Sequence, residues 1–152
     1  PLYSSAASDV YKRQHLPKPL LQFVYKFKGP DKTALCTDAM RGAGMPDGES
    51  ILGSLTNGQK VIIEDGVAKM PDRSAFAGSV ATTDRLVRTM IQVADIPLTD
   101  AVRMMTLTPA RILHIDSSKG SLETGKDADI VIFDNQIHVI NTISEGHVIY
   151  SK

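Results

Sequence analysis

The spacing of apolar residues predicts helices in two parts of the chain. Near its beginning, residues 20–28 carry apolar side chains at helical intervals, and Gly29 followed by Pro30 is expected to end this helix. Further along, a second helix is expected behind Thr82 or Thr83, either of which can serve as its N-cap. One face of this helix carries the apolar residues at 86, 87, 90, 91 and 94.

Two shorter helices are predicted after Pro97. The first begins near this proline and contains apolar residues at 101, 102, 104 and 105, of which the two methionines are expected to fill the core. Thr108 and Pro109 have the residue types of an N-cap and a first helical position, so the second is expected over residues 110–114.

Strand-like patterns lie on both sides of this helical region. The apolar run at 34–37 is typical of a buried parallel strand, and with the preceding helix it would form half of a βαβ unit. Residues 61–64 and 67–70 flank Asp65-Gly66, which is a strong signal for a type I′ hairpin turn. Near the end of the chain we predict a buried strand at 130–133, followed by two strands that pair around a turn at Glu145-Gly146. The sequence therefore belongs to the α/β class.

Length and composition argue against several classes of function. The chain has 152 residues, which is one domain or part of a larger protein, and 42% of them are apolar. Its 17 basic and 17 acidic residues cancel, so nothing favours binding to nucleic acid or to an anionic membrane surface. The apolar runs are shorter than the ~20 residues of a membrane-spanning helix. A single cysteine, Cys36, cannot form an internal disulfide and fits a reducing compartment, so we expect a cytoplasmic protein.

Residues 1–14 are expected to be foreign to the natural sequence. They show no amphipathic period and lack the apolar segment of a signal peptide. The run from Ser4 to Gln14 resembles a translated sequencing adapter, because Asp9 to Gln14 can be encoded by GAT GTG TAT AAG AGA CAG. On this interpretation the natural sequence begins near His15 and the gene is truncated upstream. The alternative is a genuine disordered tail.

Asp38 is the strongest candidate for chemistry. It follows the apolar run at 34–37 and precedes a glycine-rich loop at 41–48, so its carboxylate would stand at the C-terminal end of a strand, where α/β barrels hold their active sites. There it could act as a general base, or it could merely cap the following turn, and the residues alone leave both open. Cys36 is interpreted as a small hydrophobic residue inside the strand.

The remaining motifs resemble those of the amidohydrolase superfamily. The Thr-Pro-Ala-Arg motif at 108–111 and the Lys-Gly-Ser-Leu and Gly-Lys-Asp-Ala-Asp motifs within 119–129 occur across amidohydrolases. Thr-Asp-Ala-Met at 37–40 with the loop at 44–48, Ala-Gly-Ser at 77–79 and Thr-Asp-Arg at 83–85 resemble the N-acetylglucosamine-6-phosphate deacetylase family. The resemblance implies the last strand and helices of a (β/α)8 barrel with a β-hairpin insertion over residues 15–115. Residues 116–152 would be the C-terminal strands of a small β-sandwich.

The same resemblance implies roles for five residues. Asp38 would end the eighth barrel strand, take a proton from a metal-bound water and pass it to the leaving nitrogen. His15 would contact the sugar substrate, although the Asp-Gly-x part of its motif is replaced here by adapter-like residues. The backbone of Phe76, Ala77 and Gly78 would also contact the sugar.

The implied reaction is hydrolysis of N-acetylglucosamine 6-phosphate to glucosamine 6-phosphate and acetate in amino-sugar catabolism. In the family a divalent metal such as zinc is held by a Glu and two His on earlier strands, and these ligands are absent from this chain. The histidines at 114, 138 and 147 lack zinc-like spacing and are given surface or packing roles. We therefore assign no metal ligand, expect the chain alone to be inactive, and expect the intact enzyme to be a homodimer.

Two alternatives remain at this stage. One is another amidohydrolase branch, such as a cyclic amidase, a deaminase or an aminoacylase. The other is a genuine short protein that acts as a non-catalytic binding module.

Overall fold

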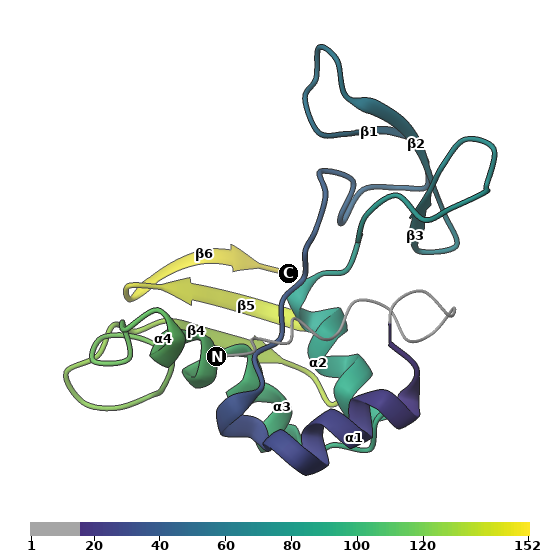
Figure 1. Ribbon diagram of the computed structural model, residues 1–152. Helices are drawn as coiled ribbons and strands as arrows, with labels where there is room; N and C mark the ends of the chain where they lie inside the picture. Colours follow the sequence, from purple (N-terminus) through teal and green to yellow (C-terminus); the bar gives the residue numbers. More distant parts are fainter. Residues whose placement is uncertain (1–15) are drawn as a thin grey trace.

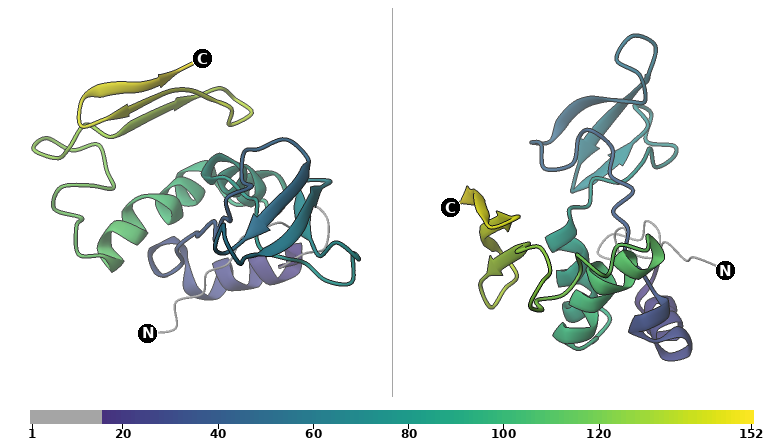
Figure 2. Two further views of the ribbon diagram at one scale, coloured as in Figure 1. Left: turned by 90° about the horizontal axis from the view of Figure 1, so that it is seen from above. Right: turned by 90° about the vertical axis from the view of Figure 1, so that its left-hand side faces the viewer.

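The computed structural model describes residues 16–152 and shows an α/β arrangement in three parts (Figure 1). Its helices are α1 (Lys18–Lys28), α2 (Thr83–Gln92), α3 (Leu98–Met105) and α4 (Leu107–Ile112), with a short 3-10 turn at Pro30–Lys32. One antiparallel sheet contains β1 (Gly48–Leu52), β2 (Gln59–Glu64) and β3 (Val67–Lys69). A second contains β4 (Ile130–Phe133), β5 (Val139–Ser144) and β6 (His147–Ser151). The sheet β1–β3 projects away from the helices, whereas β4–β6 lies beside them (Figure 2).

The helices enclose the hydrophobic core. Leu21 of α1, Leu86 and Met90 of α2 and Met104 of α3 are each at most 1% exposed and belong to one cluster. Leu35 joins this cluster from the segment after α1, and its backbone N–H donates to the Met104 carbonyl at 2.9 Å. The apolar positions that predicted α2 and α3 therefore do face a shared core. No helix within residues 16–152 is long and apolar enough to cross a bilayer.

The C-cap of α1 is confirmed, whereas at the start of α2 only the position of the predicted N-cap is confirmed. Gly29 adopts φ +68° and its N–H donates to the Tyr25 carbonyl at 2.8 Å, as expected of a helix C-cap. Thr82 occupies the N-cap position of α2, but its hydroxyl donates to the Asp84 carboxylate and makes no capping bond to the backbone.

The predicted start of α4 was wrong by three residues. The helix begins at Leu107, and Thr108 lies inside its first turn, where its buried hydroxyl donates to the Pro30 carbonyl at 2.7 Å. This bond joins α4 to the 3-10 turn far away in the sequence, and such a partner overrides a capping preference. Pro109 still falls among the first helical positions, where its missing N–H costs no helical bond.

The predicted strand at 34–37 does not form within the described chain. These residues run without regular secondary structure, and Cys36 is exposed and not inside a strand. A parallel strand depends on hydrogen bonds from neighbouring strands. Here the nearest such contact is an isolated parallel bridge between Ala39 and Ser79, which follows the predicted strand.

The hairpin around Asp65-Gly66 is confirmed. Both turn residues have positive φ, +58° and +74°, as a type I′ turn requires, and β2 pairs with β3 on either side of it. The sequence pattern did not indicate that β1 would begin as early as Gly48 and pair along the other edge of β2.

An ion-pair cluster on this hairpin makes its stability depend on pH. Arg73 donates to both Glu64 carboxylate oxygens, at 2.9 and 3.0 Å, and Lys69 lies 2.9 Å from the same group. Arg73 first and Lys69 second lower the pKa of Glu64 to about 2. Because the folded pKa lies below the ordinary value near 4.5, the stabilisation is complete above that pH and is lost as the pH falls towards 2.

We expect NMR titration of the Glu64 side-chain carboxyl to show protonation well below pH 4.5, and Arg73→Gln to move the midpoint upwards. A wild-type midpoint at 4.5 would contradict the role of this cluster.

The C-terminal strands form as predicted, but the expected burial of β4 does not occur. Val131 and Ile132 are 49% and 46% exposed, and every residue of β6 is exposed. The turn at Glu145-Gly146 has both φ angles positive, as expected of a tight hairpin. A strand is buried only when another layer covers the sheet, and within the described residues neither face of β4–β6 is fully covered.

Candidate active-site segment

Backbone pairing brings Asp38 close to the segment 76–79. Ala39 and Ser79 form the parallel bridge, and the Met40 N–H donates to the Ser79 carbonyl at 2.8 Å. Asp38 and Gly78 each precede a member of this bridged pair. The structure thus brings together the predicted catalytic residue and the predicted substrate-contacting loop, although about forty residues separate them in the chain.

The other end of this loop is attached to the sheet β1–β3. The Ala77 N–H donates to the Ala68 carbonyl at 2.9 Å, and Phe76 forms an antiparallel bridge with Lys69. Ala77 is 3% exposed, whereas the Phe76 side chain is 47% exposed. The loop is therefore held at both ends and presents an aromatic ring to solvent.

Gly78 lies in tight surroundings. Its φ of +102° is one that residues with a side chain rarely adopt, and a Cβ there would lie 3.3 Å from Leu52 Cδ1 and 3.5 Å from Met40 Cγ. A residue with a side chain would be strained by this φ, and its Cβ would press on the Leu52 side chain. This close approach explains in physical terms why glycine stands in the Ala-Gly-Ser motif.

Asp38 itself is exposed and adopts φ +45°, which is uncommon for a residue other than glycine. Aspartate tolerates this conformation better than most residues. Its carboxylate is therefore accessible to a molecule in solvent, and the Ala39–Ser79 bridge fixes the backbone immediately after it.

The remaining candidates are not assembled here. His15 and the tail at 1–14 lie outside the described residues. The histidines at 114, 138 and 147 are all exposed, and the His138 ring lies 3.1 Å from the Asp134 carboxylate. Within residues 16–152, no three His, Cys, Asp or Glu side chains are placed to hold a metal ion together.

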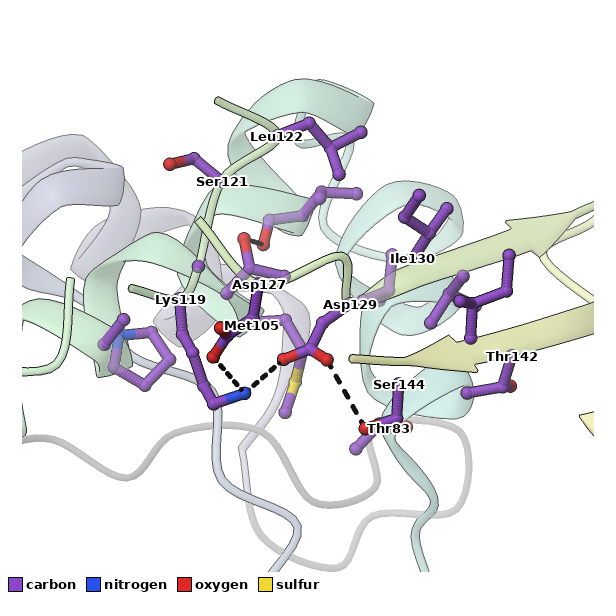
Figure 3. A pocket seen from close by; sticks show the side chains of 18 of the residues that line it. Thr83, Met105, Lys119, Ser121, Leu122, Asp127, Asp129, Ile130, Thr142 and Ser144 are labelled. Carbon is purple, nitrogen blue, oxygen red and sulfur yellow. Dashed lines mark hydrogen bonds and ion pairs between the residues drawn. The ribbon is translucent and has the colours of Figure 1, made fainter. Parts of the chain in front are cut away.

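A large apolar cavity lies elsewhere, between the helices and the sheet β4–β6 (Figure 3). It measures about 680 Å³, and neither Asp38 nor residues 76–79 line it. At its edge Lys119 bonds to the Asp129 and Asp127 carboxylates at 2.7 and 2.9 Å, which raises the pKa of Lys119 and lowers that of Asp129. These residues belong to the tail motif, and the contacts give that motif a structural role.

Two residues that hold the site together were given no role from the sequence. Met40 contacts the position of Gly78 and accepts a hydrogen bond from the Gly42 N–H at its sulfur, and Ser79 supplies the bridging carbonyl. Both belong to motifs that the sequence did single out, but backbone pairing of this kind has no signature in the residue types.

Comparison with known proteins agrees with this geometry. The model of the amidohydrolase family matches residues 31–149. The chain is 37% identical over 134 residues to N-acetylglucosamine-6-phosphate deacetylase of Lysinibacillus sphaericus, a match that covers 88% of this chain and 33% of that protein. It is 38% identical over 118 residues to N-acetylgalactosamine-6-phosphate deacetylase of Escherichia coli O157:H7, covering 78% of this chain and 30% of that protein.

A solved structure shows the same likeness in three dimensions. The crystal structure of N-acetylglucosamine-6-phosphate deacetylase from Pasteurella multocida superposes with a TM-score of 0.80 at 28% identity, over 88% of this chain and 34% of that one. The chain thus spans about a third of the length of these relatives. Because the family model covers most of its residues, the chain belongs to the amidohydrolase family.

Proposed function

We propose that the chain corresponds to the C-terminal part of a hydrolase that removes the acetyl group from N-acetylglucosamine 6-phosphate. The observation that carries this proposal is the backbone bridge between Ala39 and Ser79, which joins Asp38 to the loop 76–78. These are the two segments whose motifs resemble the deacetylases, and similarity to deacetylases extends over most of the chain.

In this proposal Asp38 moves the proton. Its exposed carboxylate accepts a proton from the water that attacks the acetyl carbonyl carbon, and then donates it to the amide nitrogen as the C–N bond breaks. The products are acetate and the free amino sugar phosphate. The loop 76–78 orients the sugar through its backbone, and the exposed ring of Phe76 offers an apolar surface beside it.

The divalent metal implied by the resemblance would need ligands beyond residues 16–152. Within those residues, Asp38 does not belong to any group of three His, Cys, Asp or Glu side chains that could hold a metal ion. The roles proposed for Asp38 and the loop 76–78 therefore involve only side-chain and backbone groups of this chain.

The proposed architecture follows the same assignment. Residues up to 115 would supply the end of the last barrel strand, the β1–β3 insertion and the adjoining helices, and residues 116–152 the closing strands of a small β-sandwich. The exposure of Val131, Ile132 and β6 supports this assignment, because a sandwich would cover those side chains. We further propose that the complete enzyme is a cytoplasmic homodimer.

Two assays test the function. The 152-residue chain with added zinc is expected to release no acetate from N-acetylglucosamine 6-phosphate. A chimera in which residues 31–149 replace the matching segment of the Lysinibacillus sphaericus enzyme should release it in a metal-dependent reaction. Turnover by the chain alone would contradict the first expectation, and a folded, metal-loaded chimera without turnover would contradict the proposal.

N-acetylgalactosamine 6-phosphate is a second candidate substrate. It is favoured by the 38% identity over 118 residues to the Escherichia coli enzyme of that name, beside 37% over 134 residues to the Lysinibacillus enzyme. The two sugars differ at a single carbon, so assaying the chimera with both in parallel compares kcat/KM directly and decides between them.

A further inference from the structure

The sheet β4–β6 is attached to the helices at two ends. At one end the loop before β4 packs on α4, where a Cβ on Gly120 would lie only 2.7 Å from Ala110 Cβ and 3.0 Å from Leu107 Cα. At the other end the turn between β4 and β5 meets α2 (Figure 1). Between these ends lies the cavity of about 680 Å³.

Arg88 of α2 makes the second attachment. Its Nε donates to the Gln136 carbonyl at 3.1 Å and its Nη2 to the Ile137 carbonyl at 3.0 Å. The same Nη2 lies 2.6 Å from the Asp84 carboxylate one helical turn earlier, which orients the guanidinium towards the turn. Charge-assisted bonds of this kind are among the stronger ones in proteins.

Ile137 completes this attachment, which we call the Arg88 latch (Arg88, Gln136 and Ile137). Its side chain is 7% exposed and belongs to the helical core cluster, yet its φ is +62°. A β-branched residue rarely adopts that conformation, and it persists only where the surroundings compensate for the strain. Burial of the Ile137 side chain and the Arg88 bonds supply that compensation.

Within residues 16–152, Phe133 of β4 also packs against the helical core cluster, next to the latch. Farther along the sheet, the cavity is lined by Val102 and Met105 on the helices and by Val139 and Ile143 on the sheet. Where a cavity replaces packing, dispersion contacts across the gap are lost. The stability of the sheet against opening therefore depends on the latch and Phe133 at one end and on the Gly120 packing at the other.

We propose that β4–β6 is a separately opening unit, which swings from its Gly120 end when the Arg88 latch breaks and uncovers the apolar cavity. Regions with few buried contacts open below the global unfolding free energy and as contiguous units. This opening withdraws Ile137 from the edge of the core cluster, whereas Leu21, Leu86 and Met104 still pack α1, α2 and α3 against one another, so the helices stay folded.

Hydrogen exchange of the full chain, followed by mass spectrometry, tests this proposal. In the wild type, amides of β5 and β6 are expected to exchange faster than those of α2 and α3, with a weaker dependence on added urea. Arg88→Gln should accelerate exchange in the sheet by about tenfold or more, as loss of two charge-assisted bonds implies, and leave the helices unchanged. Arg103→Gln removes an ion pair with Asp31 away from the sheet and serves as the matched control.

The result that overturns the proposal is equal acceleration in sheet and helices, or no acceleration in the sheet. If Arg88→Gln does not fold, Arg88→Lys keeps the charge but not the forked donation, and Ile137→Ala removes the buried side chain. Either variant should accelerate exchange of the sheet more than that of the helices.

Discussion

Asp38→Asn is expected to lower kcat by about a thousandfold in the chimera described above, with little change in KM. The substitution keeps the size and polarity of the side chain but removes the group that takes and returns the proton, and general acid–base catalysis contributes about 10²–10⁴-fold. Asparagine also tolerates the positive φ found at this position, so the backbone should be undisturbed. Steady-state kinetics of acetate release over a range of substrate concentrations separates the two parameters.

The matched control is Asp95→Asn. Asp95 also has a positive φ, is exposed, and pairs with Lys18 on the surface far from the proposed site. This variant should retain the kcat of the parent chimera. If Asp38→Asn lowers kcat less than tenfold, or both variants lower it equally, Asp38 acts only as a turn residue, which is the alternative that the sequence left open.

Elements with local signals were predictable from the sequence. The end of α1 at Gly29 and the turn at Asp65-Gly66 depend on residues that tolerate positive φ, and such residues are few. The apolar stripes of α2 and α3 also have one strong physical interpretation, which is a helix with one buried face.

Features that depend on distant partners were not predictable. The first turn of α4 includes Thr108 because its hydroxyl has a partner at Pro30, and the segment 34–37 lacks the neighbours that would make it a strand. The prediction that β4 is buried was wrong for a similar reason. An apolar strand sequence does not reveal whether a second layer exists to cover the strand.

The candidate site also combines a feature with a local sequence signal and a feature that depends on a distant partner. Asp38 could be singled out from its place between an apolar run and a glycine-rich loop, but its proximity to Gly78 depends on the bridge between Ala39 and Ser79. The hydrophobic periodicity of a sequence does not indicate such a contact between two segments that are distant in the chain. The pairing of these segments was therefore accessible only through the family resemblance, and the structure supplies its physical basis.

Gly120→Ala should be among the most destabilising single-methyl changes in this chain. Gly120 has φ +91°, and an added Cβ would lie 2.7 Å from Ala110 Cβ, 3.0 Å from Leu107 Cα and 3.2 Å from the Thr106 carbonyl oxygen. Two of these atoms belong to the backbone near the start of α4 and cannot move away alone. Conformational strain and overpacking together should reduce the free energy of unfolding by about 3 kcal/mol.

Gly125→Ala separates these two contributions. Gly125 has nearly the same φ, +92°, but no atom lies within 4 Å of the position that its Cβ would take. It should therefore carry only the conformational cost, about 1 kcal/mol, and the difference between the two variants measures the packing of the loop against α4. Urea denaturation of both variants and the wild type gives this difference directly. If the two substitutions lower the free energy of unfolding equally, the loop does not pack on α4. The sheet β4–β6 would then lack the attachment about which we propose that it opens.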